Sequence, residues 1–500
     1  MKKIFSPLFI ILILWLTSVA IRIPQLNRPL SKHHEFTTAL VLRIMYNWNE
    51  QGIVNLNFNP AVNYRGDANK FINNQSTENY DKNGNSYYLS YPPGAYLIPY
   101  LVMGGWIHPL DALSLQMFNL LLHLIECFLL WQIILLLTKN SIHQQKANLI
   151  ALIAVIVHLF SPCLLWFHSN CYMVDMPAVT LFLWCVFLWL KFTTPDFNPK
   201  YFHFILLFLS SFIFSYTEYL GVAFAGTVFL YSVFRRKYFL LSSVTILGSV
   251  AALTLTLFQY TLISGWSDLV HFIQYRYGVR SGYEFESSIS ESIFLYFAEW
   301  MQVGWNYVTG FLPWLIALSV LFFVQRKHLS QIPLKKILFW LGVPVLIHHI
   351  VFLNASLYDF QAMKASPLIA LLISFLFFVN EKKWFRFSLA ASVAFSIFIF
   401  EIINSPGKVS LIDDDFVNYD EFAYQGDFIR KNSSPDEVVF LKWIDDEPQL
   451  IWYAKRNMRT IFNDDEAISF LQKHNLKHGV IFTFDRGQLI RLEQHIELSE

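Results

Sequence analysis

Charge is scarce in this sequence of 500 residues. Asp, Glu, Lys and Arg together make up 15% of it, against about 25% in an average globular protein. Hydrophobic residues make up 55% and aromatic residues 18%. A soluble protein cannot bury so much apolar surface, whereas a membrane protein exposes it to lipid. The composition excludes a disordered chain and predicts a polytopic α-helical membrane protein.

Cysteine, glycine and proline are also few. Four Cys, 19 Gly and 19 Pro exclude a disulfide scaffold and a collagen-like fibre. Cys127 and Cys185 lie in apolar runs and are expected to pack, while Cys163 and Cys171 bracket a short loop and could form a bridge. Motifs such as HExxH or paired CxxC are absent. A bound divalent cation is therefore possible, but no motif shows where it would bind.

The net charge of +1 hides an asymmetry. Residues 404–500 contain 18 acidic and 11 basic residues, and the rest of the chain contains 18 acidic and 26 basic residues. Basic residues concentrate in the cytoplasmic loops of membrane proteins, and no basic surface is left for nucleic acid. We therefore expect a membrane-embedded domain at 1–403 and a soluble domain at 404–500.

Apolar segments predict the membrane spans. The first follows Met1-Lys2-Lys3, and Ser18-Val19-Ala20 resembles a signal-peptide cleavage site. Its run is long enough to span, at about 1.5 Å per residue, so we favour an uncleaved first helix. Ten further segments follow, near 113–137, 148–167, 176–191, 202–217, 219–234, 238–262, 308–324, 336–353, 366–380 and 386–403.

Basic connectors alternate along this map and are assigned to the cytoplasm. With the N-terminus inside, about eleven spans leave the C-terminus extracytoplasmic. The apolar stretch 94–110 is broken by prolines and glycines, so we expect a re-entrant or interfacial segment. The outer face then carries a first loop at 24–93, a second at 264–307 and the tail at 404–500.

The tail has the pattern of a small α/β domain. Apolar runs at 438–441 and 480–483 predict strands, and stretches near 447–456 and 465–474 predict helices.

Acidic residues gather at the predicted outer ends of the spans. A carboxylate at membrane depth is expensive and usually functional. The candidates are Glu35, Asp175, Glu218 and Asp359, with the histidines His34, His348 and His349 at the same level. Such a rim suits a divalent cation, a general base or a proton relay.

Cations near the same face could stabilise a phosphate leaving group. Arg276 and Arg280 are four residues apart and share one face if helical; Lys364 follows Asp359. The alternatives are contacts with lipid headgroups for the arginines and an interfacial anchor for Lys364. Two polar residues in mid-span, His123 and Glu126, are expected to form an interhelical pair.

Four short motifs carry a resemblance to a known family. They are His34-Glu35, Tyr91-Pro92-Pro93-Gly94, Val174-Asp175-Met176-Pro177 and Thr217-Glu218-Tyr219-Leu220-Gly221. Their order, with the α/β tail, resembles the GT-C superfamily of polytopic glycosyltransferases, in particular the bacterial relatives of protein O-mannosyltransferases and the aminoarabinose transferase.

The resemblance implies an inverting transferase that takes a sugar from a polyprenyl-phosphate donor in the cell membrane. An acid in the first outer loop, often within Asp-Glu, is essential in that family. Here His34 stands at the Asp position, so Glu35 takes the role, and Asp175 matches the second acid.

Rival functions remain open at this stage. A transporter or flippase predicts polar residues at mid-membrane and an inverted repeat, and the sequence shows neither in quantity. A ligase or polymerase of lipid-linked oligosaccharides fits the outer face equally well. A receptor with a sensory tail is a further alternative. Neither the sugar nor the acceptor can be read from the sequence.

Overall fold

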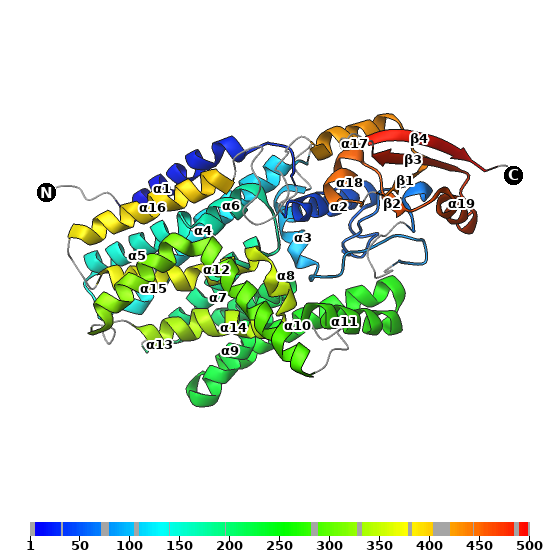
Figure 1. The fold of residues 1–500 in the computed structure, drawn as a ribbon. Helices are drawn as coiled ribbons and strands as arrows, with labels where there is room; N and C mark the ends of the chain where they lie inside the picture. Colours follow the sequence, from blue (N-terminus) through cyan, green and yellow to red (C-terminus); the bar gives the residue numbers. More distant parts are fainter. Residues whose placement is uncertain are drawn as a thin grey trace.

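The computed structural model forms an elongated helical bundle with a small α/β domain at one end (Figure 1). It describes residues 6–31, 34–71, 80–104, 110–139, 141–195, 197–281, 289–327, 333–378, 383–403, 421–443, 445–484 and 490–498.

Every apolar segment predicted to span is helical where the structure describes it. The helices of the bundle are α1 (Pro7–Arg22), α2 (Phe36–Gln51), α3 (Gly94–Pro99), α4 (Ala112–Thr138), α5 (Gln144–Leu159), α6 (Pro162–Asn170), α7 (Asp175–Phe192), α8 (Tyr201–Thr217), α9 (Leu220–Phe234), α10 (Phe239–Ser264), α11 (Trp266–Ser281), α12 (Ile289–Gln325), α13 (Leu334–Ile337), α14 (Val343–Val351), α15 (Ser366–Phe378) and α16 (Lys383–Ile403).

Seven helical segments among the described residues are long and apolar enough to cross a membrane. They are Pro7–Gln25, Ala112–Thr138, Asp175–Phe192, Arg236–Ser264, Tyr296–Gln325, Leu334–Val351 and Asp359–Phe378. Helices α5 and α6 make an eighth if their pair, bent by 60°, counts as one span. The bend falls at Pro162, which cannot continue the hydrogen-bond ladder of α5. Helices α8 and α9 are shorter apolar helices.

Three details bear on the sequence-based expectations. The first two agree with them, since the aromatic residues of 264–307 are spaced as on an interfacial helix and 94–110 is expected not to cross; the third, the cysteine pair, differs. The second outer loop is largely helical, because α11 is followed by α12, which starts at Ile289 and carries a kink at Phe311 beside Pro313. The stretch 94–110 contains the short apolar helix Gly94–Met103; at about 1.5 Å per residue it is too short to cross. Cys163 and Cys171 lie at the two ends of α6, and both are free thiols, so the possible bridge is absent.

The tail is an α/β domain, as the sequence predicts. Its elements are α17 (Glu421–Lys431), β1 (Val438–Lys442), α18 (Pro448–Ala454), β2 (Met458–Ile461), α19 (Asp464–Lys473), β3 (His478–Phe484) and β4 (Ile490–Glu497). The strand order is β2-β1-β3-β4, with β4 antiparallel to β3 and the other pairs parallel.

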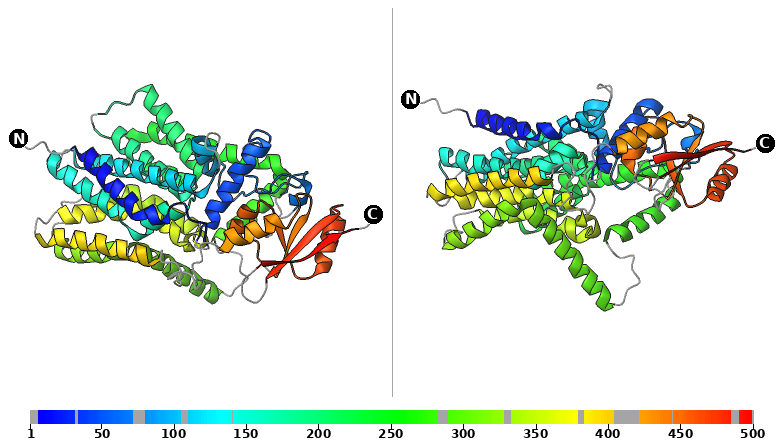
Figure 2. Two further views of the ribbon diagram at one scale, coloured as in Figure 1. Left: turned by 90° about the horizontal axis from the view of Figure 1, so that it is seen from above. Right: turned by 45° about the horizontal axis from the view of Figure 1, so that its top comes forward.

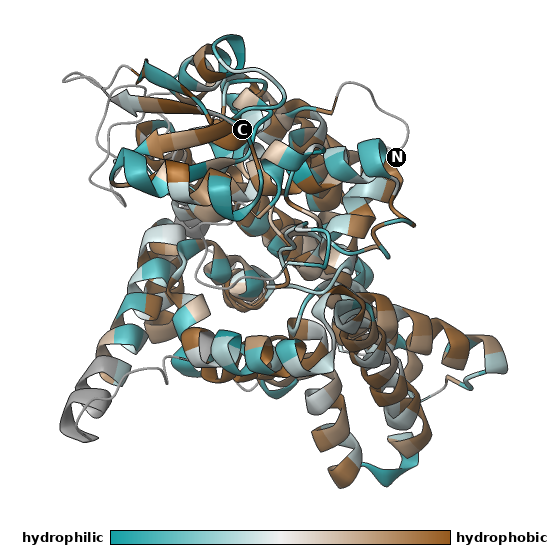
Figure 3. Ribbon diagram, turned by 90° about the vertical axis from the view of Figure 1, so that its right-hand side faces the viewer, coloured by the Kyte–Doolittle hydropathy of each residue, from teal (hydrophilic) through white to brown (hydrophobic). Residues whose placement is uncertain are grey.

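Both faces of this sheet are covered, which explains the continuous apolar run in β1. Val439 and Leu441 pack in the cluster with α17 and α18. Val438 and Phe440 pack in the cluster with α19. The polar colouring of this domain contrasts with the apolar helices that project beyond it (Figure 3).

The tail packs on the first outer loop. Asn457 joins them, because its Oδ1 accepts from Tyr64 N at 2.8 Å and its N donates to Asn69 Oδ1 at 2.8 Å. Helix α18 lies beside α2 in the views of Figures 1 and 2. The loop and the tail therefore form one covering layer at this end of the bundle.

Candidate active site

Glu35 is a buried carboxylate at the start of α2. Its side chain is fully enclosed and receives a two-pronged contact from Arg28, in which Nη1 donates to Oε2 at 2.9 Å and Nη2 donates to Oε1. Ser31 N also donates to Oε2. Arg28 reaches further, to Asn170 Oδ1 at 2.9 Å, so Glu35 is fixed against the end of α6.

The tail domain holds the strand of chain that supplies these donors. Gln449 Nε2 of α18 donates to Ser31 O at 2.8 Å, and Leu30 N donates to Tyr453 Oη at 2.8 Å. The segment from Arg28 to Ser31 is thus clamped between the tail and the bundle. The position of the Glu35 carboxylate depends on a domain more than four hundred residues away in the chain.

His34 pairs with Asp359. Its Nε2 lies 3.0 Å from Asp359 Oδ1, and Tyr358 and Phe360 contact the ring edge-on. His34 adopts φ 53, a left-handed conformation that is uncommon for a residue with a Cβ. The backbone is therefore strained at the point where the first loop turns into α2.

Asp175, Glu218 and Lys364 form a second buried group. Lys364 Nζ lies 3.0 Å from Asp175 Oδ1 and 3.1 Å from Glu218 Oε1. It also contacts His348 Nε2 at 3.0 Å and donates to Gln361 Oε1 at 2.6 Å. His348 Nε2 in turn lies 3.0 Å from Glu218 Oε1. One lysine is therefore shared by two carboxylates that come from different helices.

The predicted rim residues are brought together, with one outlier. Asp359, which pairs with His34, begins the short helix Asp359–Ala365, and the same helix carries Lys364, which pairs with Asp175 and Glu218. His349 turns away, because its ring nitrogens contact Ser356 Oγ and Tyr307 Oη, each at 2.7 Å.

The three predicted phosphate-binding cations lie in different surroundings. Lys364 is enclosed in the ion pairs above. Arg276 lies in α11 at an apolar cavity of about 280 Å³, lined by Leu89, Ser90, Tyr219, Leu253, Thr256, Leu257, Tyr260, Phe272, Ile273, Tyr277 and Phe352. The backbone of Arg280 is also in α11, but its side chain lies outside the described part of the chain.

Arg276 has one buried donor that is unused. Its Nε is buried, and no hydrogen-bond partner for it occurs among the described residues. Its guanidinium lies over the ring of Phe272, 5.7 Å from the centroid. The cavity also adjoins the Glu218 group, because it is lined by Tyr219, the next residue, and by Phe352, whose ring contacts His348.

The Tyr91–Gly94 corner borders the same cavity. Tyr260, which lines the cavity, donates its hydroxyl to Tyr91 O. Gly94 packs so closely on the end of α8 that a Cβ there would overlap the backbone carbonyl of Tyr216. Glycine is therefore required at this position by the approach of α3 to α8.

A third buried polar group lies in the bundle and was only partly anticipated. Both residues make polar contacts to other helices, as the sequence predicts. Glu126 Oε2 lies 2.9 Å from His158 Nε2, and its Oε1 accepts from Thr180 Oγ1 at 2.7 Å. His123 Nδ1 contacts Arg22 Nη2 at 3.0 Å. Arg22, the last residue of α1, was not recognised in the sequence as a partner for these residues. A charge at the end of an apolar run was the available signal.

Three of these residues lie close enough to share a metal ion. Their ligating atoms, from His123, Glu126 and His158, lie within 4.8 Å of one another. Arg22 argues against a metal there, since a guanidinium can only donate. His123 Nδ1 must then accept, which puts the proton of a neutral ring on Nε2 and removes the second lone pair.

Comparisons with known proteins locate the fold. No protein-family model matches the chain, and no curated protein sequence matches it significantly. Among solved structures, ArnT from Cupriavidus metallidurans bound to undecaprenyl phosphate is similar, with a TM-score of 0.60 and 12% identity over 94% of this chain and 92% of ArnT.

Oligosaccharyltransferases are also similar. The Archaeoglobus fulgidus enzyme in the apo form gives a TM-score of 0.53 at 11% identity, over 96% of this chain and 70% of that enzyme. The same enzyme in complex with Zn and sulfate gives a TM-score of 0.51 at 13% identity. These likenesses, together with the helical bundle and the α/β tail, show that the chain has the fold of the GT-C membrane glycosyltransferases.

Proposed function

We propose that this protein is a membrane glycosyltransferase that moves a sugar from a polyprenyl-phosphate donor to an acceptor at the extracytoplasmic face, with inversion at the anomeric carbon. The acceptor hydroxyl attacks that carbon, the bond from carbon to phosphate oxygen breaks, and polyprenyl phosphate leaves. The acceptor proton passes to a carboxylate.

The observation that carries the proposal is Arg276 beside its apolar cavity. A polyprenyl phosphate needs an apolar surface for its chain and a cation for its phosphate. The cavity supplies leucines and aromatic rings, and Arg276 supplies a charged guanidinium whose buried Nε has no partner among the described residues. The fold likeness to ArnT, which is bound to undecaprenyl phosphate, supports a lipid-linked donor.

Glu35 is the proposed base. A carboxylate has about four acceptor positions, and Arg28 and Ser31 N take three of them. One acceptor position is left, and in this proposal the acceptor hydroxyl takes it when the groups that enclose Glu35 move aside on substrate binding. The two-pronged contact with Arg28 fixes the orientation of the carboxylate before substrate arrives.

Asp175 and Glu218 take a positioning role in this proposal. Both are paired with Lys364 and have no solvent exposure beyond 1%. They lie next to the donor cavity through Tyr219, so their geometry decides the shape of the site. His34 and Asp359 complete the outer rim and offer a second proton acceptor beside Glu35.

The donor set does not fit a resident divalent cation in this arrangement. Glu35 is neutralised by Arg28, and Asp175 and Glu218 share Lys364. A metal would compete with these buried cations for the same oxygens. No step of the proposed reaction is therefore routed through a metal.

The test uses Glu35→Gln in the purified protein, supplied with a labelled polyprenyl-phosphate sugar and native membranes as the acceptor source. Loss of a general base lowers the rate by about 10²–10⁴. Glu50→Gln is the matched control, because Glu50 is exposed near the other end of α2. Transfer by Glu35→Gln at the wild-type rate would refute the base assignment. No transfer by the wild type from any lipid-linked sugar would refute the proposed function.

A further inference from the structure

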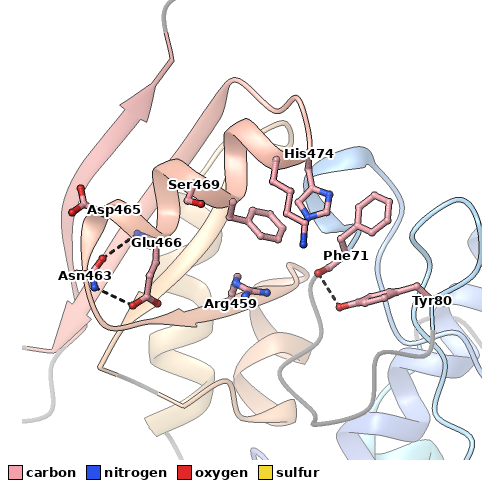
Figure 4. A pocket seen from close by; sticks show the side chains of 10 residues that line it. Phe71, Tyr80, Arg459, Asn463, Asp465, Glu466, Ser469 and His474 are labelled. Carbon is pink, nitrogen blue, oxygen red and sulfur yellow. Dashed lines mark hydrogen bonds between the residues drawn. The ribbon is translucent and has the colours of Figure 1, made fainter. Parts of the chain in front are cut away.

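A second cavity lies between the tail and the first outer loop, away from the acids. Its volume is about 510 Å³, within the range of small-molecule sites. Figure 4 shows Phe71, Tyr80 and His474 at one end, Asn463, Asp465 and Glu466 at the other, and Arg459 between them. It is built by α19, β2 and the first loop.

Aromatic rings form a fixed wall of this cavity. The rings of Phe71 and His474 are stacked, with their centroids 4.5 Å apart, and the centroids of the His474 and Phe470 rings are 4.6 Å apart. Phe71 adopts φ 58, and its ring packs against Gly84, where a Cβ would overlap it. Its N donates to Gly84 O at 3.0 Å. A strained aromatic residue held this firmly is a preorganised surface.

Polar side chains with hydrogen-bonding capacity to spare surround the wall. Among the described residues, neither Arg459 nor Lys473 has an ion pair, although Arg459 lies 4.9 Å from the centroid of the Phe470 ring. Asp465 and Ser469 are exposed and line the same space. Glu466 accepts from Asn463 Nδ2 at 3.0 Å and keeps further acceptor positions.

This combination selects a class of ligand. A pyranose ring packs one C–H face on an aromatic surface, and its hydroxyls both donate and accept hydrogen bonds. The cavity offers donors in Arg459 and Lys473 and acceptors in Asp465 and Glu466. Because the two cations balance the two acids, neither an anion nor a cation alone is favoured.

We infer that this cavity binds a neutral oligosaccharide. In Figure 1, α19 lies at the outermost end of the molecule, beyond α18, which contacts Ser31 near Glu35. A glycan that reaches from Glu35 to α19 is a chain rather than a single sugar. The length of this chain and its role as the acceptor rest on the proposed function; the binding of neutral sugar residues in the cavity does not.

The experiment measures binding to an array of linear neutral, N-acetylated and uronate-containing oligosaccharides. The full chain is held in lipid nanodiscs, free of glycoside detergents whose head groups would compete. Ser469→Trp fills the cavity, and Arg459→Ala removes its central donor. Ser434→Trp is the matched control, because Ser434 is an exposed serine of the tail that does not line the cavity.

The wild type and Ser434→Trp are expected to bind neutral oligosaccharides. Arg459→Ala loses one or two hydrogen bonds to a charged group and should bind about tenfold or more weakly. Ser469→Trp fills the cavity and should also bind about tenfold or more weakly, because the sugar is excluded. No binding by the wild type, equal binding by Ser469→Trp, or binding of uronate chains alone would overturn the inference.

Sugar transfer is assayed in the same preparations. Transfer without oligosaccharide binding would remove this inference and leave the proposed function intact. Binding of oligosaccharide without any transfer would remove the proposed function and leave the oligosaccharide site intact.

Discussion

Lys364→Met is expected to destabilise the protein rather than only to slow it. Lys364 Nζ lies within 3.1 Å of both Asp175 and Glu218, and its side chain is completely buried. Methionine keeps the length of the chain and removes the charge. Two buried carboxylates would then lose their shared counter-charge, which costs about 3–5 kcal/mol.

Glu218→Gln removes a negative charge from the same buried group instead of the positive one. It leaves one acid, Asp175, opposite one base, Lys364, so the buried charges match. We expect a cost of about 1–2 kcal/mol, close to that of a weakened hydrogen bond. Both variants are compared with Lys327→Met, an exposed lysine at the end of α12, by unfolding in one detergent followed by tryptophan fluorescence.

The same pair of variants separates two roles for Lys364. If it binds the phosphate of the donor, Lys364→Met unfolds like the wild type and has lost transfer. If it neutralises Asp175 and Glu218, the variant is less stable than Glu218→Gln. Wild-type stability in Lys364→Met would refute the ion-pair reasoning and return the lysine to the phosphate.

Four further predictions follow from the site. Arg276→Gln, which removes the cation at the donor cavity, should lower turnover by about 10²–10³ with normal folding; unchanged transfer would move the phosphate elsewhere. Gln449→Ala should lower kcat more than it raises KM, because the hydrogen bond from Gln449 to Ser31 orients Glu35. Gln449→Glu should have an equally low kcat, because a carboxylate cannot donate this hydrogen bond. Gly94→Ala should reduce the yield of folded protein, since α3 must move away from Tyr216; a normal yield contradicts the close packing. A periplasm-specific reporter fused after Glu500 should be active, and activity of a cytoplasmic reporter there instead would invert the topology.

The helical segments could be predicted because each is an apolar run with basic residues at one end. That pattern depends on local sequence alone. Their number as spans could not: eleven were expected, and seven or eight segments of the described chain are long and apolar enough to cross. The acids were found for the same reason, since the ends of the runs place them. Their partners could not be found this way. Lys364 and Asp175 are far apart in the chain, and only the packing of α7 against the segment before α15 brings them within 3.0 Å.

In the tail, too, some elements could be predicted from the local sequence and others could not. Strands β1 and β3 are continuous apolar runs and were predicted, whereas β2 and β4 were missed. Strand β2 has four residues, of which Arg459 and Thr460 are polar. Strand β4 begins with alternating Ile490 and Leu492, but its pairing with β3 shifts register between Ile481 and Phe482. In the sequence itself, the polar Gln494 stands where the alternation would place an apolar residue, so only Ile490 and Leu492 carry the period-two signal.

The buried cluster in the bundle bears on how the acids keep their places. Helix α7 carries Asp175 at its first residue and, about one and a half turns deeper, Thr180, which binds Glu126. Helix α15 begins at Ser366, which contacts His158 at 3.2 Å and follows Lys364 by two residues.

Two elements therefore connect the outer ion pairs to the inner cluster. A buried polar contact allows two helices to pack in one register only. If one helix slid by one residue along the other, the contact would break and leave a buried charge without a partner. The inner cluster thus fixes the rotation and depth of α7 and α15, and with them the distance between Asp175 and Lys364. On this reasoning, polar residues at mid-membrane, which a transporter would also require, here serve to hold an outer site in shape.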